Sequence, residues 1–341
     1  MKEKINILVI AFVIQMCLTI GLVYSGSDAN DNASNKKLLT VDYDTVSKIS
    51  IEQPEKSTLV LEKREGRWIL PGYFDFPASK SKLDRIMGKL YDLSVGWPVA
   101  TTKTAQKRFK VADEAFERKL QFMASDESQQ TLLLGTSPGF KKIHARVSGE
   151  TKVYAIAFSA YEASEKPVDW VDRGYLHLDR SDVAAIELPN LIVSKKDKQF
   201  SVEGMKDSEE LVDQELQSLL STVTSLSFDE VLGRKNKPEY QSETVELELA
   251  LLDQSGNRTS YRFAKLKDTE DFVLKVSSHP YYFRVTKMSM DALQKIDRNK
   301  LIKSKAVENP DSEDKQSVDA ESPPVKAADE FNNVQSLPVK Q

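Results

Sequence analysis

The sequence has little cysteine and little histidine, and both shortages exclude classes of protein. A single cysteine in 341 residues rules out a disulfide framework. The histidines lie far apart along the chain, without the close ligand spacing of a zinc site, so we interpret them as structural or surface residues. They are His144, His177 and His279, of which we expect His177 to face solvent from an alternating strand.

Clear nucleophile and phosphate sites are also missing. The G-x-S-x-G spacing of a serine-nucleophile elbow occurs once, at residues 135–139 (Gly-Thr-Ser-Pro-Gly). These residues contain no lysine, and the strong helix that an elbow or a phosphate loop needs does not follow, so we interpret this segment as a loop after a strand. Adjacent carboxylates such as Asp113 and Glu114 are expected by chance among 52 acidic residues. We therefore predict a protein that is not an enzyme and that holds no cofactor and no metal ion.

The charge is weak and unevenly distributed. The formal net charge is −4, and its acidic excess is concentrated in residues 304–341, which leaves the preceding part nearly neutral. Without a basic stripe, we expect no nucleic-acid partner. The acidic tail holds one aromatic residue and four prolines, too little apolar surface to offset the entropy of ordering. We predict that residues 304–341 are disordered; a partner-binding tail is the alternative.

One long apolar run is present, at residues 5–24. As a helix it spans about 30 Å, the thickness of a hydrocarbon core. Lys2 and Lys4 precede the run and acidic residues follow it, so the positive-inside rule places the N-terminus in the cytoplasm. The expectation is a single-pass protein of the inner membrane with its soluble part in the periplasm. A cleaved secretory signal, cut near Ser25, is the competing interpretation.

Between the run and the tail, the sequence repeats itself. Residues 39–51 lie over 176–188 without a gap, with apolar residues at matching positions. Each copy continues through a strand with an aromatic residue, Trp68 or Phe200, which we expect at the same core position. A helical stripe and several strands of period two follow at slightly smaller offsets. The matching helical stripes are Leu83, Ile86, Leu90 and Leu93, and Leu216, Leu219, Val223 and Leu226.

This pattern predicts an α+β fold. An N-terminal transmembrane helix leads into two homologous repeats of mostly antiparallel sheet, each with one amphipathic helix, and a disordered C-terminal tail follows. Each repeat has the usual size of a domain. The predicted parts are the anchor 1–25, a linker 26–37, the first repeat 38–165, the second repeat 166–303 and the tail 304–341.

The repeat resembles a known bacterial family, domain of unknown function 4340. The residues that carry the resemblance are Lys37-Leu38-Leu39, then Val46 with Ile49 and Ile51, then the segments 66–70 (Gly-Arg-Trp-Ile-Leu) and 170–176 (Trp-Val-Asp-Arg-Gly-Tyr-Leu). The second copy departs from the pattern at Phe200, which replaces the tryptophan. The resemblance implies a membrane-anchored protein without an assigned activity, often encoded beside ABC-transporter or gliding-motility components.

Two segments are candidates for contact with a partner. Trp97 stands before a proline just after the first helix, where the second copy has Glu230. Trp170, Asp172 and Arg173 lie in the connector between the copies. A tryptophan packed in a hinge beside a local ion pair is one interpretation of the connector. A partner-binding patch is the other, because exposed Trp and Arg are favoured interface anchors.

These observations leave two functional hypotheses. The first is a non-enzymatic accessory subunit of an ABC-transporter-like envelope complex, with the resemblance implying an ABC-type permease and its auxiliary subunit as partners. The second is a cell-wall or small-ligand binding module that acts without a transporter. A contact patch on one face favours the first, and a deep pocket with aromatic and polar groups favours the second.

Overall fold

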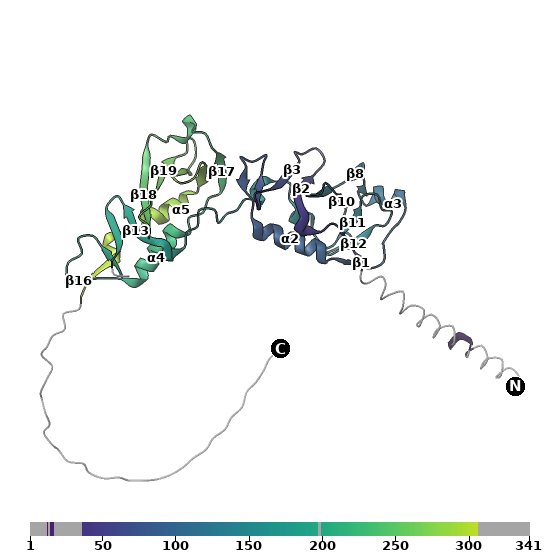
Figure 1. The fold of residues 1–341 in the computed structure, drawn as a ribbon, viewed down its shortest axis with the longest axis horizontal. Coiled ribbons are helices and arrows are strands. Elements are labelled where there is room, and N and C mark those ends of the chain that lie inside the picture. The colour runs from purple at the N-terminus through teal and green to yellow at the C-terminus, as the bar shows by residue number, and fades with distance from the viewer. Residues whose placement is uncertain (1–11, 13, 17–35, 197–198, 306–341) are drawn as a thin grey trace, which may run out of the picture. The chain divides into compact units, whose positions relative to one another are not determined.

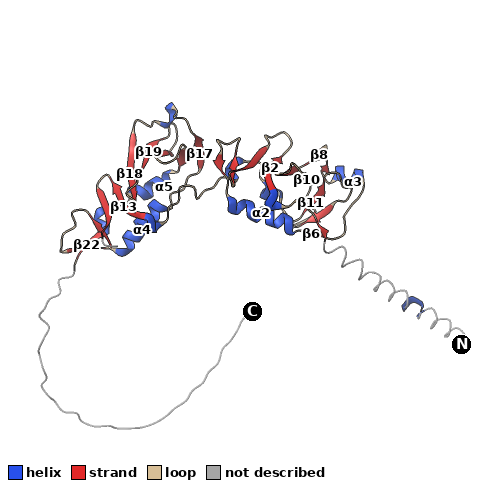
Figure 2. Ribbon diagram, viewed as in Figure 1, coloured by secondary structure: helices blue, strands red, loops and turns tan. Residues whose placement is uncertain are grey.

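A computed structural model describes residues 12, 14–16, 36–196 and 199–305. The expected anchor and tail therefore lie almost wholly outside the described residues. Among the residues that the structure describes, no helix has the length and apolar character needed to cross a membrane. The fold is α+β, as expected, and two antiparallel sheets of eight strands dominate it (Figures 1 and 2).

The first sheet is built from residues 46–156. Its centre is the pair β2 and β9, and hairpins extend it on both sides. In spatial order its strands are β12 (Tyr154–Ile156), β11 (Ile143–Val147), β10 (Gln129–Leu134), β9 (Arg118–Ala124), β2 (Val46–Glu52), β3 (Leu59–Arg64), β4 (Arg67–Leu70) and β5 (Phe76–Pro77).

The second sheet is built from residues 183–285. Within it, β13 pairs with β18 as β2 pairs with β9 in the first sheet. In spatial order its strands are β17 (Glu230–Gly233), β21 (Tyr282–Val285), β20 (Phe272–Val276), β19 (Arg258–Lys265), β18 (Val245–Asp253), β13 (Val183–Leu188), β14 (Leu191–Lys196) and β15 (Gln199–Val202).

Seven strands follow the same order in both sheets. A 3₁₀ turn precedes the first strand of each: η1 (Tyr43–Thr45) and η4 (Arg180–Asp182), capped by the side chains of Asp42 and Asp179. These first strands are β2, which pairs with β9, and β13, which pairs with β18. In both pairs the register shifts near the start of the strand, between Val46 and Lys48 in the first sheet and between Val183 and Ala185 in the second. Shared bulges and caps at one offset indicate that the sequence repeat is also a structural repeat.

The expected helices form at the expected places. They are α2 (Lys80–Asp92) and α4 (Asp213–Thr224), and the apolar stripe of each is buried in the core. Ser79 caps α2 by accepting a hydrogen bond from the N–H of Lys82. Spacings of three and four put the apolar residues on one face, which the sheet's apolar side chains cover. The buried members are Leu83, Ile86, Met87 and Leu90 of α2 and Leu216, Leu219, Leu220, Val223 and Thr224 of α4.

Trp68 and Phe200 occupy the same register position. Trp68 pairs with Lys63 across β3 and β4, and Phe200 pairs with Lys195 across β14 and β15. Their burial differs, because Trp68 is 6% exposed whereas Phe200 is half-buried with the ammonium of Lys195 above its ring at 5.6 Å. The shared position is confirmed, and full core burial holds for the tryptophan alone of the two.

Further short elements distinguish the halves, which therefore hold more than the single helix each that was expected. The additional helices are too short for their apolar residues to show a helical period in the sequence. The first half adds α3 (Lys103–Arg108), β7 (Val111–Ala112) and β8 (Ala115–Phe116), and its β6 (Ser94–Val95) pairs with β1 (Lys36–Lys37). The second half adds α5 (Lys287–Gln294), α6 (Arg298–Leu301), η5 (Pro238–Tyr240) and the pair β16 (Glu209–Leu211) and β22 (Ile302–Ser304).

A cluster of aromatic rings joins the halves. Phe76 of β5 is fully buried and lies 4.9–6.1 Å, ring centroid to centroid, from four rings of the connector and the second half. These partners are Tyr175, Phe228, Tyr281 and Phe283. The division into domains at residue 165 stays a prediction, since the described residues up to Lys303 belong to one compact unit with a continuous core.

Candidate functional site

Trp97 lies at the surface. It sits in a bend two residues after β6, and its side chain is 68% exposed. The following segment runs along the edge strand β12, because the N–H of Val99 donates to the carbonyl of Val153 at 2.8 Å. Val95, in β6, pairs with Lys36 of β1. Trp97 is therefore next to the strand through which the chain enters the described fold.

Trp170 is buried instead, with 2% of its surface exposed. Its indole N–H donates to the carbonyl of Ser164 at 2.8 Å, and the ammonium of Lys82 lies 4.5 Å from its ring centroid. Burial lowers the pKa of Lys82. The carbonyl of Trp170 accepts from the N–H of Ser79 at the start of α2. The indole thus ties the connector to the first half, as the hinge interpretation expects.

Asp172 and Arg173 point to different partners. The Arg173 guanidinium donates to the carbonyls of Phe228 and Asp229 at 2.5 and 2.7 Å, and its centre lies 5.7 Å from the Phe228 ring. The Asp172 carboxylate accepts from the N–H of Gly174 at 3.0 Å. These bonds replace the local ion pair that was expected, because the second half offers the guanidinium two carbonyls. Whether the connector binds a partner stays a prediction.

The four candidate residues do not form one patch. Trp97 lies beside β12, at one edge of the first sheet, whereas Val171, next to Trp170, bridges to Ala78 beyond β5 at the opposite edge. The structure therefore separates an exposed tryptophan near β1 from a connector that packs inside the chain.

The connector also contains a buried charged network that the sequence did not predict. Glu165 has a side chain 7% exposed, and its carboxylate accepts from Lys56 at 2.6 Å and from Arg118 at 2.9 Å. The hydrogen bond from Lys56 and the charges of Arg118 and Lys56 hold the Glu165 pKa below its usual value. A cavity of about 460 Å³ opens here, lined by these three residues together with Lys82, Tyr161, Ser164, Lys166 and Asp169. Its size is that of a small-molecule site.

A second charged group supports the inserted β7–β8 hairpin. The Arg146 side chain is 2% exposed and donates to the carbonyl of Val111 at 2.5 Å and to Asp113 at 2.7 Å. Hydrogen bonds from Ser148 and then from Arg146 lower the pKa of Asp113. Asp113 therefore neutralises a buried cation, which is a structural role rather than the simple solvation expected from its adjacent carboxylate.

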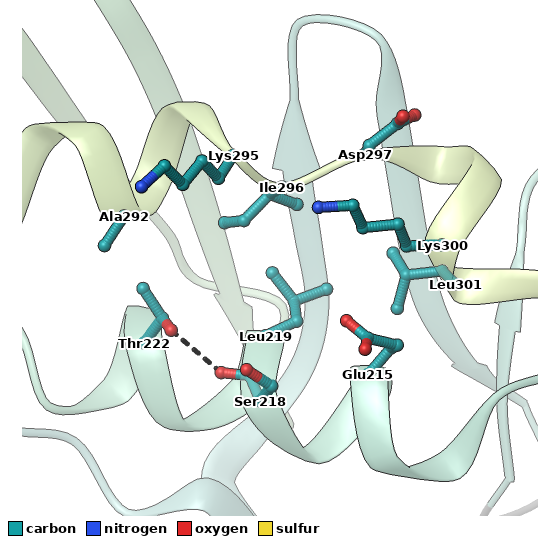
Figure 3. Close-up of a pocket in the computed structure, with 10 residues that line it drawn as sticks. All are labelled: Glu215, Ser218, Leu219, Thr222, Ala292, Lys295, Ile296, Asp297, Lys300 and Leu301. Atoms are coloured by element: carbon teal, nitrogen blue, oxygen red, sulfur yellow. Dashed lines mark hydrogen bonds between the residues drawn. The ribbon is translucent and has the colours of Figure 1, made fainter.

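A groove lies between α4 and the α5–α6 segment (Figure 3). Glu215, Ser218 and Thr222 line it from α4, and Lys295 and Lys300 line it from the other side. The Thr222 hydroxyl donates to the carbonyl of Ser218 at 2.9 Å, so it is already engaged. The volume of about 200 Å³ is below the usual range of ligand pockets. The groove is a packing gap between helices more than a ligand site.

The histidines lie in three separate surroundings. His144 is buried, stacked on Phe109 with ring centroids 4.0 Å apart. His177 is exposed, as expected, but it lies in the segment between a turn and η4 and not in a strand. His279 is half-buried with its ring 4.6 Å from that of Tyr175, and burial and then the charge of Lys275 lower its pKa. Within residues 36–196 and 199–305, no three His, Cys, Asp or Glu side chains are grouped to hold a metal ion.

The glycine-containing segment 135–139 closes a loop, as expected. The Ser137 hydroxyl donates to the carbonyls of Gly139 and Lys142, both at 2.8 Å. Gly135 passes so close to the carbonyl of Phe109 that a Cβ atom there would lie 1.9 Å from it. The loop's glycine and serine thus serve its shape, and the exposed Phe140 stands at its tip.

The comparisons with known proteins match part of the chain to one family. Residues 68–245, more than half of the chain, match the family described as "Domain of unknown function (DUF4340)". No curated protein and no solved structure matches the chain. The matched residues run from Trp68 of the first sheet through the connector to the start of β18, so they include the joint between the halves. This chain belongs to the DUF4340 family.

Proposed function

We propose that the chain is a membrane-anchored, extracytoplasmic protein that works by contact, as an accessory subunit of an ABC-transporter-like envelope complex. The observation that carries the proposal is the exposed Trp97 beside β1. The other two tryptophans, Trp68 and Trp170, are 6% and 2% exposed. A tryptophan left two-thirds exposed next to the entering chain favours a surface on the side of the anchor that orients the first half toward a partner in the same membrane.

The proposed topology supports this. The apolar run 5–24 is long enough to span a bilayer, and the lysines before it favour a cytoplasmic N-terminus. Eleven residues then lead to Lys36 of β1. The first half would thus be confined near the membrane.

The finer account of the fold belongs to the same proposal. We interpret the two halves as products of a duplication, because the caps of η1 and η4 and the neighbouring register shifts coincide at one offset. A duplicated sheet-and-helix unit gives an extended surface. We propose that this surface contacts an ABC-type permease and its auxiliary subunit, the partners that the family resemblance implies.

A second function is favoured by the cavity at Glu165. Its volume of about 460 Å³ and its lining of Lys56, Lys82, Arg118 and Tyr161 suit a small anionic ligand or a fragment of the cell wall. Glu165 weakens this alternative, because it already accepts from Lys56 and Arg118.

The proposal is tested by crosslinking in native membranes. The full chain with an affinity tag after Gln341 is crosslinked, purified and analysed by quantitative mass spectrometry. We expect a permease to be enriched over unrelated membrane proteins of similar abundance. A Trp97→Ser variant should lower that enrichment, and a His177→Gln variant, changed at another exposed position, should not. Equal recovery of all membrane proteins would reject the accessory role.

The anchor has its own test. Confinement to the partner's membrane raises effective concentration, an effect that reaches about 10²–10⁴-fold in affinity. A version released by a cleavable signal should therefore lose the crosslink at native expression and regain it when overproduced. A reporter fused after Gln341 should be active outside the cytoplasm. A mature protein that begins near Gly26 would refute the anchor and leave the location intact.

A further inference from the structure

Three loops meet at one end of the first sheet. β10 ends at Leu134 and β11 begins at Ile143, so the loop 135–142 turns at this end. Ile143 pairs with Ile156, the last residue of β12, so the segment that follows β12 leaves from the same end. That segment includes η2 (Ala160–Ala163), with Tyr161.

Trp97 belongs to the same end. Ala100 bridges antiparallel to Val153, so residues before Ala100 advance along β12 in its own direction, toward Ile156. β6, which ends two residues before Trp97, also contacts β12, so Trp97 lies beside β12 between these two contacts. We call Trp97, Phe140 and Tyr161 the aromatic end.

The aromatic end is strongly exposed. Trp97, Phe140 and Tyr161 are 68%, 87% and 91% exposed. The turns at the opposite end of this sheet, 125–128 and 148–151, hold polar and acidic residues and none of the large exposed hydrophobic side chains found among the described residues. The asymmetry puts the exposed rings of this sheet's loops on one side.

Lysines accompany the rings. Lys141 and Lys142 follow Phe140, and the Lys141 ammonium lies 5.1 Å from its ring centroid. Lys166, at the rim of the Glu165 cavity, is exposed on the connector. The carboxylates of Glu162 and Glu165 at this end already bind Lys89, Lys56 and Arg118. Exposed Asp169 lines the same cavity as Lys166, so the outer surface combines aromatic rings with lysines and some acidic residues.

The length of chain before β1 indicates what covers this end. Lys36 pairs with Val95, two residues before Trp97, and residues 25–35 link it to the apolar run. Eleven residues span at most about 40 Å when fully extended. We propose that the aromatic end rests in the headgroup layer of the bilayer that holds residues 5–24, an inference that rests on the proposed anchor.

The chemistry of the end suits a lipid surface. Tryptophan and tyrosine favour the membrane–water interface because their rings have an apolar body and a polar atom. Lysines beside them favour anionic lipid headgroups. Contact through three rings would fix how the first half faces the membrane, which a linker of eleven residues alone would not do. A protein partner over the same surface is the competing outcome.

The experiment uses the intrinsic tryptophans of the full chain. The protein is reconstituted into vesicles of equal parts phosphatidylcholine and phosphatidylglycerol, with or without bromine on the acyl chains as a quencher. Residues 1–35 contain no tryptophan, and Trp68 and Trp170 are buried. We expect brominated lipid to quench the emission of one indole in three, and a Trp97→Phe variant to be insensitive to bromine. Adding Phe140→Trp to that variant should restore quenching.

The outcomes separate the inference from the anchor. A chain that fails to float with the vesicles refutes the proposed anchor. A chain that floats but whose emission is unaffected by bromine overturns the aromatic-end proposal and leaves the anchor standing. Shielding of Trp97 from a water-soluble quencher in native membranes but not in the vesicles would assign the end to a protein partner, and would also overturn it.

Discussion

The two halves of the molecule share a framework and differ at their surfaces. Seven strands run in the same order in both sheets, and the stripes of α2 and α4 are buried in the same way. At the ends of the strands the halves diverge. Phe140 stands where the offset of 129 residues puts Thr269, and Tyr161 corresponds to Met290, which is buried in α5.

This divergence has a physical explanation. Core positions tolerate few changes of volume, and the two halves have the same apolar pattern at these positions. Loop tips have no such constraint, so an exposed ring can stand in the first half where the second has a polar residue, as at Phe140 and Thr269. The half that bears the exposed rings is the one joined to the apolar run through β1.

The largest expected difference between the halves concerns their matched aromatic residues. Trp68→Ala removes a buried indole and should lower the free energy of unfolding by about 3–5 kcal/mol. Phe200→Ala, at the same register position but half-exposed, should cost about 1–2 kcal/mol, because the Phe200 ring buries less apolar area on folding than Trp68 does. Urea unfolding of both variants measures this. Equal costs would mean that the two positions are equally buried in solution.

The next difference concerns the segments that follow the matching strands β12 and β21, and how each half fixes its segment to the fold. In the first half Glu165 fixes it to Lys56 and Arg118, and in the second half Met290 of α5 is fully buried. Glu165→Gln should cost about 1–3 kcal/mol of unfolding free energy at neutral pH, the value of hydrogen bonds to charged groups. Met290→Ala should cost about 2–5 kcal/mol at every pH.

The pH dependence distinguishes the two mechanisms. Because the folded-state pKa of Glu165 lies below its usual 4.5, the stabilisation is present above that pH and is lost as the pH falls through the folded pKa. The gap between wild type and Glu165→Gln should therefore close in acid, whereas the gap for Met290→Ala should not. A gap for Glu165→Gln that is constant down to low pH would contradict the charged network.

A smaller effect is expected from His279, in the second half. Burial and the Lys275 charge lower its pKa, so the folded state disfavours the imidazolium. The contribution of neutral His279 to the free energy of unfolding is fully present above about pH 6.5, and it is lost as the pH falls from there through the folded-state pKa. Unfolding curves across this range should show a loss of stability that His279→Gln reduces. His177→Gln, at an exposed position, should leave the loss unchanged.

Sequence periodicity was sufficient for the framework and insufficient for the sites. Period-two strands and the stripe beginning at Leu83 are local patterns, and each predicts its own element. The pairing of Glu165 with Lys56 joins residues 109 positions apart, so no local pattern contains it. The burial of Trp170 depends on Lys82 and Ser164, and the short α3 has no full apolar stripe. Exposed rings at Phe140 and Tyr161 likewise became evident from the folded loops.

The central claim, that the first half faces the membrane and the second does not, is tested most directly by spin labels at matched loop tips. Phe140→Cys and Thr269→Cys are made separately in the full chain with Cys17→Ser, and each label is examined in vesicles by its accessibility to oxygen and to a water-soluble nickel chelate. Both positions are exposed tips of equivalent hairpins. The account predicts that the label at 140 favours oxygen, as in the headgroup and acyl layers, and that the label at 269 favours the chelate. Two labels that are equally accessible to the chelate would contradict it.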